Sequence, residues 1–264
     1  MLYTENNYFE TQSRNSMAVN YTDISKTYDS YRSYPQDLIK RIIELGRISR
    51  GKKVLDLGCG TGNIVSQIKN IIDADLIGVD VSLEMLKVAK SKSLEVIRTD
   101  IDNQQLPFRD GSFDTIVGAY VIHQIKNLNF LLSECYRVLR NGALVLLTSS
   151  HKQIEEQHPI IKEFFPSYVS IDKSRFPDIH KIDDVLGSSG FKDIKHEEVT
   201  VANIPLDNEY LQKVKNKYVS TYHLMPEGEF ENGVAKLVAF IKNSGQSEFR
   251  DWHGTIVHGM KIIN

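Results

Sequence analysis

Apolar and polar positions follow two different patterns along the first 150 residues of the chain. Short, mostly apolar runs predict buried strands at 54–57, 76–80, 96–100, 113–120 and 143–148. Between these runs, apolar residues recur every three or four positions, which predicts helices at 35–46, 63–72 and 128–140 and one capped by Ser82. Strands that alternate with helices predict an α/β fold with a parallel, doubly wound sheet.

The chain after residue 150 has a less regular pattern. Prolines interrupt short helical stretches between residues 151 and 182, as in an insertion over the strand ends. The pattern then predicts a helix at 182–190, a strand at 191–201, a helical segment at 207–245 that breaks near 225–228, and a strand at 252–262. The two helical segments together are long enough to form a cap over the sheet.

Glycines predict local features at three further places. Asn141 and Gly142 are residue types that readily adopt the left-handed backbone conformation in which α-helices often end. They predict where the 128–140 helix stops. Gly254 and Gly259 lie inside the last predicted strand, where glycine often marks a bulge or a close backbone approach. We therefore expect irregular pairing at these two positions.

The stretch from Val54 to Gly62 reads V-L-D-L-G-C-G-T-G and joins the first strand to a helix. Its glycines lack the β-carbons that would keep a ligand away from the backbone, and the helix behind them offers free N–H groups. A dinucleotide fingerprint would have a third glycine where Asn63 stands, and Asp56 would repel a pyrophosphate. A carboxylate at this position suits a ligand that carries a positive charge.

This stretch resembles motif I of the class I S-adenosylmethionine (SAM) dependent methyltransferases. Tyr28–Arg32, which reads Y-D-S-Y-R, and Leu106–Phe108, which reads L-P-F, match further sequences usual in that family. The matching motifs extend from about Tyr28 to Ser150. The resemblance implies a Rossmann-like, mostly parallel seven-stranded sheet with helical cap insertions and an antiparallel last pair of strands. It also implies SAM as cofactor and S-adenosylhomocysteine as product.

Carried over position by position, the resemblance implies a set of cofactor-binding residues. Asp56 would face the methionine end of SAM, and Asp100 and Ile101 would bind the adenine. Asp80 lies 18 residues after Gly62, near the spacing at which a carboxylate accepts hydrogen bonds from ribose hydroxyls, although it could also be a solvated strand end or a helix cap. The full expected set is Tyr28, Arg32, Asp56, Gly58, Cys59, Gly60, Asp80, Val81, Met85, Asp100, Ile101 and Tyr120.

The N-terminal segment is expected to act as a lid on the cofactor. On a helix, Tyr28, Tyr31 and Arg32 share one face, and a guanidinium is well shaped to bind the carboxylate of SAM. The alternative is an aromatic patch packed on the sheet edge. The expected organisation is an arm and lid at 1–35, a SAM-binding core at 36–150, and the rest of the sheet at 151–264 with cap insertions at 151–180 and 203–245.

The end of the fourth strand is the expected acceptor site, because ligands of open α/β sheets bind beyond the carboxyl ends of strands. His123 is the candidate general base for an oxygen or nitrogen nucleophile, with a hydrogen-bonded wall residue as the alternative. The candidate acceptor-binding residues are His123, Gln124, His151 and Tyr222. No metal is expected, because the methyl group of SAM is already activated and the two cysteines, Cys59 and Cys135, cannot form a metal site by themselves.

Composition narrows the class of partner. Hydrophobic residues make up 41% of the chain, and 32 Lys and Arg face 34 Asp and Glu, so no net field favours nucleic acid or anionic lipid. No apolar run approaches the length of about 18 residues that a membrane span needs. We expect a cytoplasmic monomer or homodimer that acts on a small molecule and binds neither nucleic acid nor membrane.

These observations leave three functions open. The first is a SAM-dependent methyltransferase that transfers a methyl group to an oxygen or nitrogen atom of a small molecule, or to a carbon atom. The second is a SAM-binding protein without methyl transfer. The third, an NAD(P)-dependent oxidoreductase, is disfavoured by Asn63 and Asp56.

Overall fold

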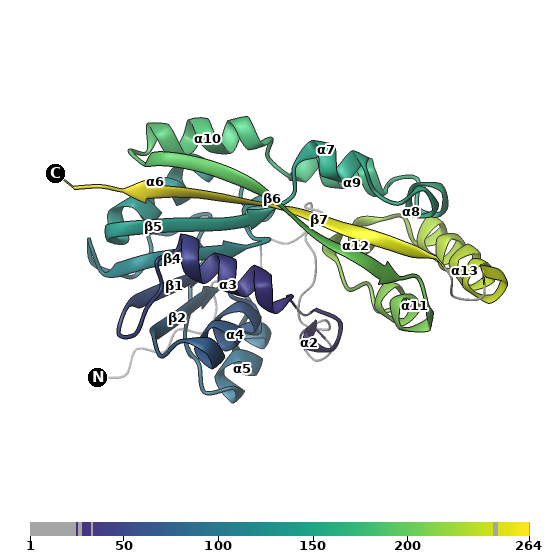
Figure 1. Ribbon diagram of the computed structural model, residues 1–264, viewed down its shortest axis with the longest axis horizontal. Coiled ribbons are helices and arrows are strands. Elements are labelled where there is room, and N and C mark those ends of the chain that lie inside the picture. The colour runs from purple at the N-terminus through teal and green to yellow at the C-terminus, as the bar shows by residue number, and fades with distance from the viewer. Residues whose placement is uncertain (1–24, 26–27, 33, 245–247, 264) are drawn as a thin grey trace, which may run out of the picture.

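A computed structural model describes residue 25 and residues 28–32, 34–244 and 248–263 of the protein. Its core is a seven-stranded sheet with the order β3-β2-β1-β4-β5-β7-β6 (Figure 1). The strands are β1 (Lys53–Leu57), β2 (Asp75–Asp80), β3 (Glu95–Arg98), β4 (Phe113–Ala119), β5 (Leu139–Thr148), β6 (Lys192–Pro205) and β7 (Phe249–Lys261). All neighbours are parallel except β7, which is antiparallel to both β5 and β6. The predicted fold class is confirmed.

Helices cover both faces of the sheet, as the alternation of elements predicts. The helices α3 (Gln36–Leu45), α4 (Asn63–Ile71) and α5 (Leu83–Ser91) pack on one face, and α6 (Leu128–Val138) and α10 (Ile179–Ser188) pack on the other. Neighbouring residues of a strand point to opposite faces, so Val54 packs in the apolar core on the side of α3 and α4, and Leu55 in the core on the side of α6 and α10. Both are fully buried, which explains why most residues of the central strands are apolar.

A third apolar cluster holds the cap together. The cap helices are α7 (His151–Glu155), α8 (Pro159–Phe164), α9 (Tyr168–Arg175), α11 (Asn208–Lys215), α12 (Ser220–Leu224) and α13 (Glu227–Ser244). Phe165, Tyr222 and Leu237 are completely or almost completely buried at its centre. The two inserted segments therefore share one core, separate from those of the sheet.

Two short elements of the described chain remain, α2 (Tyr28–Tyr31) and the 3₁₀ turn η1 (Ile122–Gln124).

The last two strands join the sheet to the cap. β7 pairs with β5 only from Thr255 to Lys261, while its first half, from Phe249 to Gly254, pairs with β6 alone. This two-stranded ribbon leaves the sheet and passes toward the cap helices (Figure 1). Side chains of the ribbon can therefore reach a space between cap and sheet.

Two predictions from glycines are wrong. The helix predicted at 128–140 ends at Val138, and Gly142 lies inside β5, where a β-carbon would come within 1.8 Å of the carbonyl oxygen of Asp114. Gly142 is needed for this close approach of two chains and not for a helix end. Gly254 and Gly259 pair in regular register, and the shifts in the β6–β7 ladder fall at Lys192/Lys195 and Val201/Ile204.

In the part of the chain that the structure describes, no helix combines the length and the apolar character needed to cross a membrane.

Candidate cofactor and acceptor site

The glycine turn after β1 has the backbone conformation that its sequence suggests. Gly58, Gly60 and Gly62 have φ of 60°, 54° and 76°, in the left-handed region that residues with a β-carbon rarely adopt. A β-carbon on Gly58 would lie 2.4 Å from Val121, whereas one on Gly60 would meet open space. The missing side chain of Gly60 therefore leaves its backbone accessible to a ligand.

Asp80, at the end of β2, holds this turn in place. Its Oδ2 accepts a hydrogen bond from the backbone N–H of Gly60 at 2.9 Å, and its Oδ1 accepts one from Ser82 at 2.8 Å. Burial raises the pKa of Asp80, and the backbone donors work against that increase. Ser82, and not Asp80, is the N-cap of α5. Each carboxylate oxygen can accept a second hydrogen bond, so the residue keeps the capacity to bind ribose hydroxyls.

Asp56 lies on β1 close to the same turn and is only 2% exposed. Its carboxylate forms no hydrogen bond or ion pair with another described residue. Burial, followed by the charge of Asp80, raises its pKa well above the ordinary value. A buried carboxylate without a partner is costly, and a cationic ligand group would relieve that cost. The donor set thus fits a cofactor that carries a positive charge.

The other residues expected to contact the cofactor differ in accessibility. Val81 is 55% exposed, whereas Met85 and Ile101 are buried in the core. Asp100 accepts hydrogen bonds from the backbone of Asp102 at 3.1 Å and from the side chain of Asn103 at 2.8 Å, so it shapes the turn after β3. Their contacts with a cofactor remain predictions.

Cys59 lies inside the turn, and burial raises the pKa of its thiol, so it stays protonated at neutral pH. Among the described residues, no three His, Cys, Asp or Glu side chains gather into a possible metal site.

The N-terminal helix α2 packs against the glycine turn. The carboxylate of Asp29 accepts a hydrogen bond from Thr61 at 2.6 Å and forms an ion pair with Lys92 at 2.5 Å. Asn63, at the position that rules out a dinucleotide fingerprint, donates from its side chain to the carbonyl oxygen of Arg32 at 2.6 Å. These contacts connect the N-terminal segment to the C-terminal end of the turn and to the start of α4.

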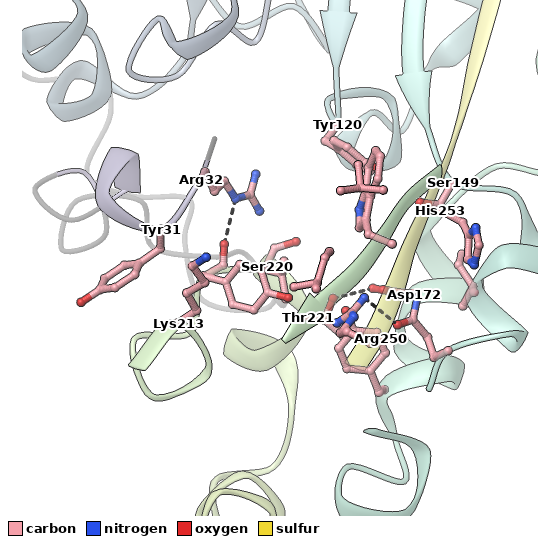
Figure 2. Close-up of a pocket in the computed structure, with 18 of the residues that line it drawn as sticks. Tyr31, Arg32, Tyr120, Ser149, Asp172, Lys213, Ser220, Thr221, Arg250 and His253 are labelled. Atoms are coloured by element: carbon pink, nitrogen blue, oxygen red, sulfur yellow. Dashed lines mark hydrogen bonds between the residues drawn. The ribbon is translucent and has the colours of Figure 1, made fainter. Parts of the chain in front are cut away.

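Arg32 links the N-terminal segment to the cap as well. Its Nε donates to the carbonyl oxygen of Tyr218 at 2.8 Å (Figure 2). Its Nη1 donates to the hydroxyl of Tyr28 at 2.5 Å. The guanidinium also lies 4.7 Å from the centre of the Tyr28 ring. Tyr28 and Arg32 therefore share one face of the helix, as their spacing predicts.

A cavity of about 400 Å³ lies between the strand ends and the cap. Five of the predicted site residues line it, namely Tyr28, Arg32, Tyr120, His123 and Gln124. The cap and the β6–β7 ribbon contribute Tyr168, Asp172, Phe176, Tyr210, Lys213, Tyr218, Thr221, Arg250, Trp252 and His253, and Figure 2 shows several of these side chains around one space. The cavity thus joins the predicted cofactor side of the molecule to the cap.

His123 lies in η1, just beyond β4, and is 8% exposed. Its ring stacks on Phe176, with 4.2 Å between ring centres and 11° between ring planes. Neither ring nitrogen has a hydrogen-bond partner among the described residues, so the alternative of a hydrogen-bonded wall residue is not observed. Burial, followed by the charges of Arg175 and Arg32, lowers the pKa of His123 well below 6.5. The imidazole is therefore neutral near pH 7, with both ring nitrogens free of partners in the described part of the chain, although burial makes it a weaker base than an exposed histidine.

Asp172 provides the carboxylate of the cap side of the cavity. It accepts hydrogen bonds from Arg175 Nη2 and from the hydroxyl of Thr221, both at 2.7 Å. Burial raises its pKa, while these two donors lower it. Its negative charge is thus compensated within the cap by Arg175.

Two candidate acceptor-binding residues lie outside the cavity lining, which corrects their expected placement. Tyr222 is 1% exposed and packs in the cap core, 5.1 Å from Phe165 and 5.7 Å from Phe230 between ring centres. His151 lies behind the wall, where its Nε2 is 2.8 Å from the carbonyl oxygen of Phe176. Tyr222 is predicted to contact the acceptor, but the cap needs this ring for its own core.

The sequence reasoning missed the cavity residues of the β6–β7 ribbon. Arg250 and Trp252 are two positions apart on β7, so they project to the same side of the strand. That alternation is visible in the sequence. What it cannot show is that this half of the strand extends beyond the sheet and faces the cap.

Comparison with known proteins agrees with this geometry. Residues 55–147 match a family model described as a methyltransferase domain. The chain is 26% identical over 213 residues to demethylmenaquinone methyltransferase of Lactococcus lactis subsp. lactis. The alignment covers 67% of this chain and 82% of that protein.

Two solved structures share the fold over most of the chain. A methyltransferase from Anabaena variabilis, assigned to an antibiotic biosynthesis pathway, superimposes with a TM-score of 0.70 and 21% identity, covering 87% of this chain and 98% of the other. Phosphoethanolamine N-methyltransferase 2 of Haemonchus contortus, in complex with phosphomonomethylethanolamine and S-adenosylhomocysteine, gives a TM-score of 0.61 and 18% identity. That match covers 93% of this chain and 61% of the nematode protein.

Proposed function

Because the chain is a class I SAM-dependent methyltransferase, we propose that it methylates a small molecule bound in the cavity between the sheet and the cap. The acceptor atom is an oxygen or nitrogen, with carbon as the further option. The observation that carries the proposal is the position of the cavity, which is lined on one side by Tyr28, Arg32 and Tyr120 and on the other by the cap. Its volume of about 400 Å³ is in the range of small-molecule sites.

The cofactor site is proposed to use charge at two points and hydrogen bonds elsewhere. Asp56 would face the cationic methionine end, and Arg32 would pair with the carboxylate of the same moiety. Asp80 would bind the ribose, and Asp100 and Ile101 would contact the adenine. SAM supplies a methyl group on a sulfonium, which is already activated for transfer. The protein then has to align the acceptor and keep water out.

His123 is proposed as the general base for an acceptor whose nucleophile carries a proton. It is neutral, lies in the cavity wall and has two ring nitrogens without partners in the described part of the chain. The stack on Phe176 holds the ring plane, and the carbonyl oxygen of Phe176 is in turn held by His151. The orientation of the base is thus set by packing, which leaves both nitrogens available.

The N-terminal segment is proposed as the lid of this site. Its helix contacts the glycine turn through Asp29 and the cap through Arg32. Because none of these contacts is part of the sheet, the segment can separate from the turn without disturbing the core. Such a lid would let the cofactor exchange and then exclude water.

A methyl-transfer assay with isotope-labelled SAM over a panel of metabolites tests the proposal. We expect one class of small molecule to acquire the label with matching formation of S-adenosylhomocysteine. SAM binding without transfer to any acceptor, from metabolites to protein and RNA, would instead support a SAM-binding protein. Tight binding of NADH with none of SAM would contradict both.

A further inference from the structure

Arg250 is a buried cation that has no anionic partner among the described residues. The residue is 5% exposed and lies on the β7 ribbon, where it lines the cavity. Its hydrogen-bond acceptors among the described residues are all neutral: Nη1 donates to the Tyr210 hydroxyl at 3.0 Å, Nη2 to Gln157 Oε1 at 3.3 Å, and Nε to the carbonyl oxygen of Asp251 at 3.5 Å. No carboxylate of the described residues forms an ion pair with it. Burying a charge in this way is costly unless an opposite charge is supplied.

The guanidinium also has hydrogen-bonding capacity to spare. It carries five N–H donors, and the three bonds above use one on each nitrogen. Among the described residues, one N–H on each of the two Nη atoms is therefore left without an acceptor, and an oxyanion can accept two guanidinium donors in a fork arrangement. A purely structural arginine would be expected to use these donors on a carboxylate or on backbone carbonyls.

The other charges of the cavity wall do not compensate Arg250. Asp172 is already paired with Arg175, and Lys213 is paired with Glu209 at 2.8 Å. The carboxylate of Asp251, the next residue in the chain, accepts a hydrogen bond from the backbone of Asn203. The cavity thus has an excess of positive charge on its ribbon side.

Arg32 and Arg250 serve different parts of the cavity. Arg32 comes from the N-terminal segment and Arg250 from the β7 ribbon, and the two lie well apart in Figure 2. Since the proposed function assigns Arg32 to the carboxylate of the cofactor, Arg250 is left for the acceptor. Phenolic groups surround it: burial raises the pKa of Tyr168 and of Tyr218, so both hydroxyls stay protonated and can donate hydrogen bonds.

We propose that Arg250, with Tyr210 and Gln157 holding its guanidinium, binds an oxyanion group of the acceptor, so the substrate is an acidic small molecule that carries a carboxylate or a phosphate. That the anion belongs to a methyl acceptor rests on the proposed function, whereas the oxyanion subsite itself does not depend on methyl transfer. The anion would make the charge-assisted bonds that the protein leaves unmade, and it would position the rest of the acceptor toward the cofactor side of the cavity.

Thermal unfolding of the full chain, saturated with S-adenosylhomocysteine, tests the subsite. The probes are acetate, inorganic phosphate and, as a neutral isostere of acetate, acetamide, each titrated at constant ionic strength. A ligand that binds only the folded state raises its stability in proportion to its occupancy, so the titrations give apparent affinities. The variants are Arg250→Gln, Arg250→Lys and, as a matched control, Arg50→Gln, which removes the same charge from a side chain that is 87% exposed.

We expect acetate or phosphate to stabilise the wild type and Arg50→Gln, and acetamide to have no effect. Arg250→Gln should lower the affinity for that anion by about tenfold or more, and Arg250→Lys, which keeps the charge but not the fork, should lie between. Comparison of the two anions distinguishes a carboxylate site from a phosphate site. An unchanged affinity for S-adenosylhomocysteine in Arg250→Gln shows that the variant is folded.

Equal anion affinity in the wild type and Arg250→Gln would overturn the subsite, as would equal effects of acetate, phosphate and acetamide on the wild type. Once a methyl acceptor is found, a neutral one with the same kcat/KM in wild type and Arg250→Gln would also overturn it, while leaving the methyltransferase assignment intact. Conversely, anion binding that depends on Arg250 in a protein that methylates nothing would support the subsite and contradict the proposed function.

Discussion

The cofactor side and the acceptor side of the molecule are built in different ways. Around the glycine turn, each polar residue lies within a few positions of a strand end, and Asp80 contacts neighbours only 2 and 20 residues away in the chain. In the cavity wall, Arg250 contacts Tyr210 and Gln157, which are 40 and 93 residues distant. Short-range order therefore shapes the first site, and long-range packing shapes the second.

This difference predicts how the two sites respond to substitution. A local site is fixed by the backbone of two strands, so its variants should change cofactor affinity and little else. A site assembled from the cap and the ribbon should change the handling of the acceptor and leave cofactor affinity alone. Single substitutions on each side of the molecule test that separation.

The largest effect is expected from His123→Gln on turnover. If the histidine is the general base, kcat should fall by roughly 10²- to 10⁴-fold, while the affinity for SAM measured by calorimetry stays within a few-fold. His180→Gln, on an exposed residue of α10, is the matched control and should retain full activity. An unchanged kcat in a folded His123→Gln protein would remove the base from the mechanism.

Asp80→Ala should have the next largest effect, on cofactor affinity. The substitution removes the charge-assisted acceptor proposed for the ribose and the anchor of the glycine turn. Loss of such a partner costs about 1.5–3 kcal/mol, roughly tenfold to over a hundredfold in Kd for SAM. Asp75→Ala, at the exposed start of the same strand, serves as control. Wild-type SAM affinity in a folded Asp80→Ala protein would contradict the ribose assignment.

Arg32→Ala should weaken SAM binding by about tenfold, a smaller effect, because water can partly replace a half-buried guanidinium. The same change removes the link to Tyr218, so proteolysis between residues 20 and 35 should become less sensitive to S-adenosylhomocysteine. In the wild type, that cleavage should slow markedly when the ligand is added. Identical cleavage rates with and without ligand would contradict the lid.

Asp56→Asn should stabilise the cofactor-free protein and weaken its binding of SAM. The pKa of Asp56 is raised in the folded state, so the unfolded chain gives up this proton more readily and stability is lost as pH rises above about 3.9 toward the folded pKa. An amide does not ionise, so at neutral pH the variant should gain about 1 kcal/mol, or roughly 2–4 °C in Tm. A lower Tm together with normal SAM affinity would show that Asp56 is stabilised by partners other than the cofactor.

The smallest effect is the contribution of His123 to acid sensitivity. Its pKa is lowered in the folded state, so the unfolded chain binds this proton more readily and stability falls as pH drops below about 6.5. The difference in Tm between His123→Phe and the wild type should therefore shift in favour of the variant between pH 7.5 and 5.5, by a few degrees at most. A difference that does not change with pH would mean that the histidine is not buried as a neutral group.

Much of the cofactor side was predictable from the sequence, because each feature has a local cause. The apolar run before the glycines becomes β1, and Ser82 caps α5 as its residue type and position indicate. Predictions went wrong where a residue served a distant partner. Gly142 resembles a helix end but accommodates the backbone of Asp114, and Tyr222 resembles a ligand contact but fills the cap core.

Local sequence is enough to predict the doubly wound sheet, the positions of Asp56 and Asp80 near the ends of neighbouring strands, and the left-handed turn between strand and helix. These follow from hydrophobic periodicity and from the conformational freedom of glycine, which act over a few residues. Which side of the β7 strand faces the cap, and therefore whether Arg250 lines the cavity, depends on the packing of distant segments. Burial of a strand face depends on what packs against it, and the cap that packs here is assembled from two segments separated by a helix and a strand of the sheet domain.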